Sequence, residues 1–232
     1  MDKKQKIIKL RRAGYSHKEI TKKLGISLRD SVKTSRNIQL SKKGKRRYFQ
    51  KVNGIVKPIK KQNKKLSLAK IRIIGNLLFD GSLYKTIGYH HSLMYINSSI
   101  ELVKKFCKDI KEIYGIKPSI FIVKGKTTAY RAKYNSKLIF LDLLRYTPSY
   151  STSNKIAKIP KEITNGSKKA KIEFLKTFWD NEGSISIKGR LRGYSNSNKI
   201  IKQLFIMHKE LGFDAKIYKD RNNYILNLNK NT

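Results

Sequence analysis

Two acidic residues in this strongly basic chain stand where a carboxylate could do chemistry. Asp80 follows the apolar run IRIIGNLLF and precedes Gly81, while Glu182 follows FLKTFWDN and precedes Gly183. Each acid ends a segment whose apolar residues spread over most faces of a helix, which is typical of a helix buried against other protein. The simplest arrangement packs these two helices on each other, and it brings Asp80 and Glu182 together.

Such a pair of carboxylates favours a bound cation. Two adjacent carboxylates oppose joint ionisation, and the dipole at a helix C-terminus also disfavours negative charge. Oxygen-only ligands suit Mg²⁺, for which we expect Mn²⁺ to substitute. Gly81 and Gly183 let two backbones approach closely, and their carbonyl oxygens could add ligands. Metal-bound carboxylates in basic surroundings indicate phosphodiester hydrolysis. One copy alone would be explained more simply as a solvated helix end.

The composition agrees with a polyanionic partner. The 232 residues include 54 Lys or Arg and 15 Asp or Glu, a formal charge of +39, which attracts nucleic acid. No apolar run reaches the roughly 20 residues that span a bilayer, and the N-terminal residues MDKKQKIIKLRRAG lack the long uncharged core of a secretory signal. The lone Cys107 excludes a disulfide framework or a cysteine-based zinc site. We expect an intracellular protein of the cytoplasm or nucleoid, or of an organelle in a eukaryotic host, with no membrane partner and no small-molecule substrate.

Residues 1–40 predict a helix-turn-helix domain. Three short helices are expected over 3–37; Ser16 and Glu19 form a capping box, and Gly25 marks the turn. The apolar residues spaced to pack between these helices are Ile20, Leu24, Ile26 and Val32. The third helix would enter the DNA major groove and present Arg29, Lys33, Thr34 and Arg36. A basic three-helix bundle with another role is the alternative.

Residues 41–67 predict a basic linker. The segment 42–65 holds eleven Lys or Arg, among them Arg46 and Arg47, and no acid. Such a chain repels itself and would order only on a phosphate backbone. The alternative is a solvated tether that provides reach alone.

An internal repeat begins at residue 68 and sets the fold class as α+β. Residues 68–150 and 172–232 each predict the order α-β-β-α-β-β, and an inter-repeat linker, 151–171, joins them. The first repeat closes with the helix LIFLDLLRY, and the second is expected to lack that helix.

The predicted strands alternate in polarity, which gives each sheet one polar and basic face. A face of this kind can lie in a DNA groove and contact base edges, although an ordinary solvent-facing sheet is the alternative. The expected DNA-binding residues are Tyr84, Thr86, Arg131, Lys133, Asn135, Ser186, Lys188, Arg190, Asn227 and Asn229.

These features resemble the LAGLIDADG homing endonuclease family in its single-chain, two-repeat form. The nine-residue signature aligns with IIGNLLFDG at 73–81 and with LKTFWDNEG at 175–183. The resemblance implies two pseudo-symmetric halves whose sheets form a saddle over double-stranded DNA. It also implies a monomer in which Asp80 and Glu182 bind Mg²⁺ and cut both strands of a long site, and intron homing as the biological setting.

The family comparison also points to further catalytic groups. A family lysine lies shortly before the second signature helix, and Lys155 and Lys158 are the candidates here. A Lys or Gln that orders the attacking water often precedes the middle helix of each repeat, where this chain has Ser98 and Ser197.

The sequence therefore predicts a site-specific double-strand DNA endonuclease. The alternative is a DNA- or RNA-binding regulator or maturase on the same scaffold without cleavage, which the two serines and the missing helix favour. A nucleic-acid packing or ribosomal protein is a third hypothesis.

Overall fold

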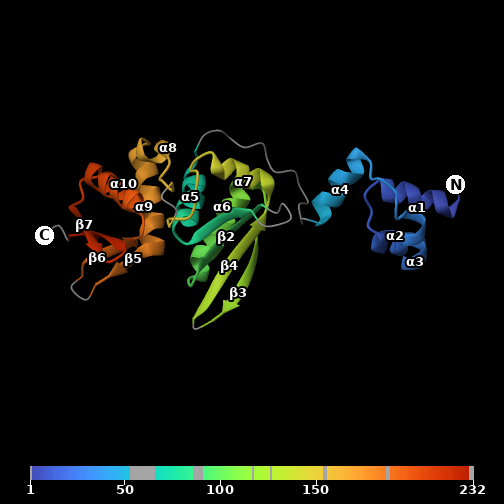
Figure 1. Ribbon diagram of the computed structural model, residues 1–232, viewed down its shortest axis with the longest axis horizontal. Helices are drawn as coiled ribbons and strands as arrows, with labels where there is room; N and C mark the ends of the chain where they lie inside the picture. The colour runs from blue at the N-terminus through green and yellow to red at the C-terminus, as the bar shows by residue number, and fades with distance from the viewer. Residues whose placement is uncertain are drawn as a thin grey trace. The chain divides into compact units, whose positions relative to one another are not determined.

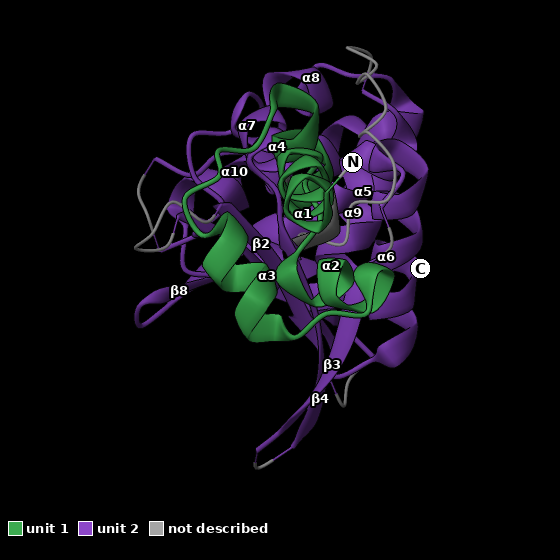
Figure 2. Ribbon diagram, turned by 90° about the vertical axis from the view of Figure 1, so that its right-hand side faces the viewer, with its two compact units in different colours: residues 1–58 green, residues 59–232 purple. Residues whose placement is uncertain are grey.

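The computed structural model describes residues 2–52, 66–85, 91–116, 118–125, 127–153, 156–186 and 189–229. The chain divides into two compact units, residues 1–58 and residues 59–232 (Figure 2). The predicted boundary at residue 41 therefore differs from the division in the structure.

The first unit is helical, as predicted for residues 3–37. Ser16 caps the second helix in a capping box with Glu19, Gly25 ends that helix at φ 59°, and Ser27 caps the third. Ile7, Ile20 and Ile26 form the small core of this unit. The helices are α1 (Lys3–Arg12), α2 (His17–Leu24), α3 (Leu28–Ser35) and α4 (Lys42–Val52).

Helix α4 corrects the linker prediction, since residues 42–52 fold instead of forming a tether. Gly14 and Gly44 meet backbone to backbone, so that a Cβ on either residue would overlap the other segment. The Ser41 hydroxyl donates to the Arg12 carbonyl and accepts from the Gly44 N–H, which caps α4. The linker prediction rests on charge repulsion alone, and it does not account for this close packing of α4 on the end of α1. The rest of the predicted linker, residues 53–65, lies outside the described residues.

The second unit contains the predicted repeat. The first copy comprises α5 (Leu68–Phe79), β1 (Gly81–Lys85), β2 (His91–Asn97), α6 (Ile100–Tyr114), β3 (Ser119–Lys124) and β4 (Thr128–Asn135), followed by α7 (Lys137–Leu144) (Figure 1). After the short α8 (Lys161–Thr164), the second copy comprises α9 (Lys168–Glu182), β5 (Gly183–Ile185), β6 (Leu191–Ser195), α10 (Asn198–Glu210), β7 (Ala215–Asp220) and β8 (Asn223–Leu228). The predicted α+β class and the order α-β-β-α-β-β are confirmed.

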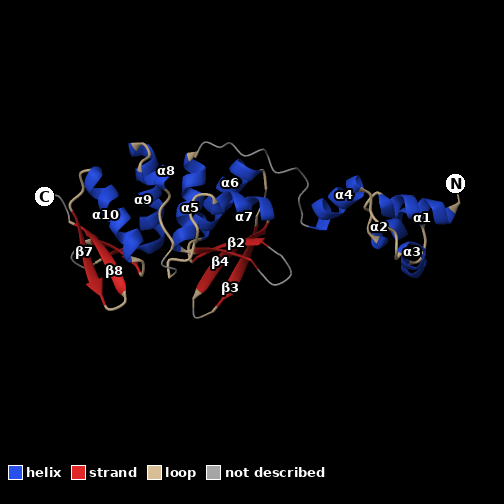
Figure 3. Ribbon diagram, turned by 45° about the horizontal axis from the view of Figure 1, so that its top comes forward, coloured by secondary structure: helices blue, strands red, loops and turns tan. Residues whose placement is uncertain are grey.

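Each copy builds one antiparallel sheet of four strands. The strand orders are β1-β2-β4-β3 and β5-β6-β8-β7, so the two sheets have the same topology. Among the described residues of the second unit, helices lie on one face of each sheet and none lies on the opposite face, which is called the uncovered face below (Figure 3). Residues 151–171, predicted as a linker, also hold α8 and the first turn of α9. Within the described residues, β8 is the last element of the second copy.

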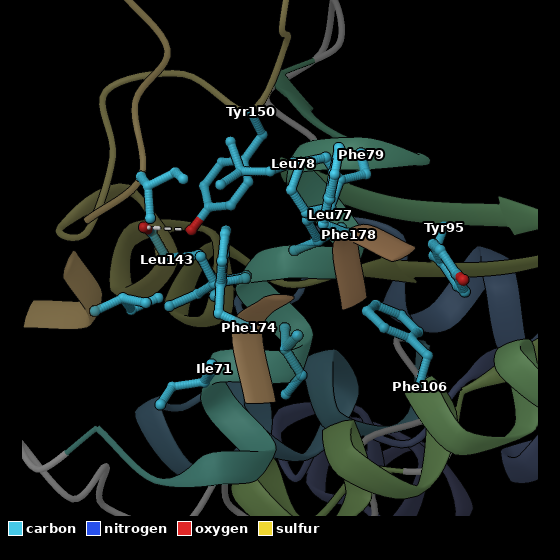
Figure 4. Close-up of a cluster of buried hydrophobic side chains, with 14 of the residues drawn as sticks. Ile71, Leu77, Leu78, Phe79, Tyr95, Phe106, Leu143, Tyr150, Phe174 and Phe178 are labelled. Atoms are coloured by element: carbon cyan, nitrogen blue, oxygen red, sulfur yellow. Dashed lines mark hydrogen bonds between the residues drawn. The ribbon is translucent and has the colours of Figure 1, made fainter. Parts of the chain in front are cut away.

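The two signature helices α5 and α9 pack on each other, as expected from their apolar surfaces. The Phe79 ring lies 5.6 Å from that of Phe174 and 5.2 Å from that of Phe178, measured between centroids (Figure 4). Gly75 faces Thr177, and a Cβ on Gly75 would collide with the threonine hydroxyl. The helices therefore approach through a glycine on one side and aromatic rings on the other.

Three ion pairs connect α5 to neighbouring helices. Arg72 donates to Asp109 on α6 at 2.6 and 2.8 Å and to Glu173 on α9 at 2.7 Å, which links the two repeats. Lys70 lies 2.5 Å from Asp142 on α7, and each side chain is only 2% exposed. These buried charges place α5 between its neighbours.

Candidate active site

The structure brings the two predicted carboxylates to adjacent helix ends. Asp80 is the C-cap of α5, and Glu182 is the last residue of α9. Burial raises the pKa of Glu182 to about 7, and the negative charge of Asp80 adds to the rise. Burial also raises the pKa of Asp80, although a hydrogen bond from Asn97 opposes it. The two side chains therefore lie within electrostatic range of each other.

This donor set fits a divalent cation. Both carboxyls are partly desolvated and raise each other's cost of ionisation, which a positive ion between them would remove. Within the described part of the chain, no three His, Cys, Asp or Glu side chains gather to hold a metal. Two carboxylates alone suit Mg²⁺, which takes its remaining ligands from water and from a substrate phosphate.

Gly81 and Gly183 follow the two acids because neither position has room for a side chain. A Cβ on Gly81 would overlap the backbone of Leu77, and a Cβ on Gly183 would overlap the Trp179 carbonyl. The two residues begin β1 and β5. A tight passage from helix to strand accounts for both glycines, and their carbonyls as metal ligands stay a prediction.

A polar network that the sequence analysis missed connects Asp80 to the second repeat. The Asn97 amide donates to Asp80 Oδ2 at 2.8 Å and lies 3.5 Å from Asn181 Oδ1. Asn181 in turn accepts from the Tyr95 hydroxyl at 2.8 Å and donates to Asn76 Oδ1 at 2.9 Å. Asn97 is the last residue of β2. Its contact with Asp80 depends on how β2 pairs with β1, and the alternation of polar and apolar residues in the sequence does not give that pairing.

The serines before the two middle helices are helix caps. Ser99 accepts from the Leu102 N–H, and Ser197 accepts from the Ile200 N–H. The residue equivalent to Ser197 is therefore Ser99, which corrects the pairing of Ser197 with Ser98. Asn97 and Ser195 occupy matching places, because each accepts through its side chain from the N–H two residues on.

The surroundings of Glu182 differ from those of Asp80. Ser195 is shorter than Asn97, and no side chain among the described residues hydrogen-bonds Glu182, whose pKa reflects only burial and Asp80. Beside Glu182 lies a hollow of about 280 Å³, lined also by Thr152, Tyr194, Ser195, Asn196 and Asn223. The second repeat thus leaves space at its carboxylate where the first repeat has an amide.

Among the described residues, no lysine affects the ionisation of the two carboxylates. Lys158 lies before α8, where its backbone N–H meets Thr147 Oγ1 at 3.4 Å. No described lysine contributes to the pKa shift of Asp80 or Glu182. Lys155 lies outside the described residues. A catalytic lysine therefore stays a prediction.

In the first sheet, the predicted alternation of polar and apolar residues is present. Ala132 is 1% exposed and packs toward the helices, while Arg131 and Lys133 point to the uncovered face. Asn135 shares this face and accepts from the Ser92 hydroxyl at 2.6 Å. Tyr84 lies opposite Ser92 on β1, on the same face, and Thr86 lies outside the described residues.

In the second sheet, Asn227 lies on the uncovered face opposite Arg192 and Lys216, but it is only 8% exposed. Asn229 follows β8 and donates to Asp214 Oδ2 at 2.6 Å, so its amide already has a partner. Ser186 and Arg190 close the turn between β5 and β6 through backbone and hydroxyl hydrogen bonds, and Lys188 lies outside the described residues.

Several buried polar atoms on the two sheets have no partner among the described residues. They are Ser82 Oγ, Arg131 Nε, Arg192 Nε and Asn227 Oδ1. Strand register places all four on the uncovered faces, beside Lys133 in one sheet and Lys216 in the other. Buried polar groups normally have partners, which water or a polar ligand on this surface would supply.

The basic residues predicted on α3 are accessible, with one correction to the packing. Arg29, Lys33 and Arg36 are exposed, and Thr34 is half-buried. Val32 was expected in the core but is 37% exposed, because Ser31 and Ser35 occupy the buried side of α3.

The two arginines predicted on the linker differ in their surroundings. Arg46 on α4 is exposed. The Arg47 guanidinium lies 3.4 Å from the centroid of the Tyr15 ring and 3.9 Å from Glu19. Arg47 thus contributes to the attachment of α4, and a DNA contact by either arginine stays a prediction.

Comparisons with known proteins point to one fold. Residues 169–231 match the sequence model of the LAGLIDADG-like domain. A structure of mesophilic variants of the homing endonuclease I-DmoI is similar at 24% identity and a TM-score of 0.54, covering 71% of this chain and 90% of that one. I-DmoI in complex with DNA and Mn matches at 22% identity and a TM-score of 0.54, covering 71% and 91%.

The homing endonuclease I-WcaI, bound to its DNA recognition sequence, matches at 12% identity and a TM-score of 0.53, covering 78% of this chain and 81% of that one. No curated protein matches the sequence. Across the described residues, every helix is too short or too polar to cross a membrane.

Proposed function

From the similarity of this fold to that of homing endonucleases, we propose that the protein is a site-specific, Mg²⁺-dependent endonuclease that cuts both strands of double-stranded DNA. The observation that carries the proposal is the pair Asp80 and Glu182 at the adjacent ends of α5 and α9. The single chain supplies both carboxylates, so it acts as a monomer on a long recognition site.

The residues of the site have different roles. Asp80 and Glu182 would hold the metal, and the Asn97 amide keeps Asp80 oriented through its hydrogen bond to Oδ2. When bound, Mg²⁺ supplies a nucleophilic hydroxide and stabilises the departing oxygen of the phosphodiester. Burial and the charge of Asp80 raise the pKa of Glu182 to about 7, so a bound cation would favour the carboxylate form that ligates it.

The uncovered faces of the two sheets would hold the DNA. Arg131 and Lys133 in the first repeat and Arg192 and Lys216 in the second point to these faces. The partnerless polar atoms there would find phosphates, sugars or base edges. The first unit, with its exposed basic residues on α3 and α4, would extend the contacted site by means of a helix-turn-helix.

Cleavage of a randomised duplex library in Mg²⁺ tests the proposal. We expect the wild type to cut a restricted set of sequences, whereas Asp80→Asn and Glu182→Gln bind the same sequences and leave them intact. The matched control is Asp180→Asn, which removes another acid from α9. The Asp180 side chain is 40% exposed and lies 4.0 Å from the Lys105 ammonium. The control should cut like the wild type, and loss of cutting in all variants alike would reject the assignment of the two carboxylates.

A binding protein without cleavage is the second candidate function. The observation that favours it is the asymmetry of the site, since Ser195 replaces the amide that Asn97 provides in the first repeat. Specific binding by the wild type with every duplex left uncut in Mg²⁺ and in Mn²⁺ would establish this alternative. Binding without sequence preference would instead indicate a packing protein.

A further inference from the structure

Helix α3 buries small polar side chains and exposes aliphatic ones. Ser31 and Ser35, one turn apart, are both 0% exposed, whereas Leu28 and Val32, also one turn apart, are 47% and 37% exposed. A surface helix of a small bundle normally buries its aliphatic residues. Leu28 and Val32 stand outside the apolar cluster of this unit, which Ile7, Ile20 and Ile26 form.

The buried side of α3 packs through the hydroxyls of Ser31 and Ser35, without Leu28 and Val32. Ser31 Oγ lies 3.3 Å from His17 Nδ1, and Ser35 Oγ donates to the Ser31 carbonyl at 2.7 Å. Ser35 Oγ also lies 3.5 Å from the same His17 nitrogen. The two contacts with His17 of α2 fix the rotation of α3 about its axis, and that rotation turns Leu28 and Val32 outward.

The charges around the aliphatic pair indicate what covers it. Spacing by four residues places Leu28, Val32 and Arg36 in one row along the helix, and Arg29 and Lys33 in the next row. All three basic residues are exposed. The acid of this helix, Asp30, accepts a hydrogen bond from the Ser27 hydroxyl at the helix start. The face is therefore a short aliphatic strip beside positive charge.

A partner for this face must be a polyanion that also offers small apolar groups. The DNA major groove admits an α-helix, carries phosphates on both rims and exposes the methyl group of each thymine, which aliphatic side chains contact. We propose that Leu28 and Val32 contact thymine methyl groups and thereby select thymine-containing sequences for the first unit. The inference rests only on the DNA-binding part of the proposed function.

Replacement of thymine by uracil removes the methyl group and leaves the base-pair hydrogen bonds unchanged. The full chain selects its duplexes from a randomised library in EDTA, where cleavage does not interfere. Each thymine of a selected duplex is then replaced singly by uracil, and binding is measured. We expect uracil at one or two positions to weaken binding about fourfold each, the factor that corresponds to about 0.8 kcal/mol per buried methyl.

The side chains are tested on the same duplexes with the double variant Leu28→Ala and Val32→Ala. It should bind the thymine duplex less tightly than the wild type does and should be indifferent to uracil at the sensitive positions. Since both side chains are exposed, its thermal transition should match that of the wild type. The control Leu138→Ala truncates a leucine of α7 that is 61% exposed, and it should keep the uracil response of the wild type.

Two results would overturn the proposal. One is a wild type that binds thymine and uracil duplexes equally at every position. The other is a double variant that weakens binding to both duplexes by the same factor, which would assign the pair a structural role or a protein partner. Because binding is measured without metal, a protein that never cuts DNA would refute the endonuclease function and leave this result intact.

Discussion

The variant Glu182→Gln should make the metal-free protein more stable at alkaline pH. In the folded chain, burial and the charge of Asp80 raise the pKa of Glu182 from its ordinary value of 4.5 to about 7. Between these two values the folded state keeps a proton that the unfolded chain has released. The stabilising contribution is therefore complete below pH 4.5 and is lost as the pH rises through 7.

The size of the effect follows from the same two values. The full difference corresponds to about 3 kcal/mol, and screening by solvent at a partly exposed side chain reduces it to about 2 kcal/mol. Glutamine does not titrate. The free energy of unfolding of Glu182→Gln, relative to that of the wild type, should thus rise by about 2 kcal/mol between pH 4.5 and pH 8.

Urea unfolding in EDTA at several pH values measures this difference. Trp179, the single tryptophan, lies on α9 within one turn of Glu182 and reports on the second unit by its fluorescence. Other titrating groups cancel because the variant is compared with the wild type at each pH. Asp80→Asn removes the charge that raises the pKa of Glu182 and should shrink the pH-dependent difference, whereas Asp180→Asn should leave it unchanged. If the free energy of unfolding depends on pH in the same way for Glu182→Gln and the wild type, Glu182 is not buried beside Asp80.

Three further changes test the scaffold. Gly75→Ala should lower the free energy of unfolding by about 1–3 kcal/mol in urea titrations, because its methyl collides with Thr177, and adding Thr177→Ala should restore part of the loss. Lys70→Met removes the buried cation beside the Asp142 carboxylate, which keeps its hydrogen bond from the Tyr114 hydroxyl, and it should cost about 3 kcal/mol by the same method, whereas a second change, Asp142→Asn, should reduce that cost. In single-turnover assays, Asn97→Ala should slow cleavage about 10–100-fold and keep the affinity for DNA, because Asp80 loses the amide that orients it. An unchanged cleavage rate would show that Asn97 does not act in the site.

The repeat architecture could be predicted because its signal is local and occurs twice. An apolar helix that ends in an acid and a glycine, followed by alternating strands, recurs after a hundred residues, and the structure shows both copies with the same strand order. The packing of α5 on α9 could be predicted from their apolar surfaces, since these two helices stand out in the sequence by carrying apolar residues on most faces.

The parts that were missed depend on geometry that the sequence does not encode locally. Asn97 reaches Asp80 only through the pairing of β2 in its sheet, and Val32 is exposed because Ser31 and His17 set the rotation of α3. Helix α4 was predicted as a linker from its charge, yet a backbone contact at Gly44 holds it against α1. Periodicity describes each element, whereas these contacts depend on how elements meet.

The most direct test of the account is the position of Mn²⁺ in crystals of the protein with a selected duplex, located by anomalous scattering. We predict manganese within coordination distance of both Asp80 and Glu182 and against a phosphate of the DNA. Manganese elsewhere, or two carboxylates that lie far apart with no metal at either, would contradict the claim that these residues form one metal-dependent active site.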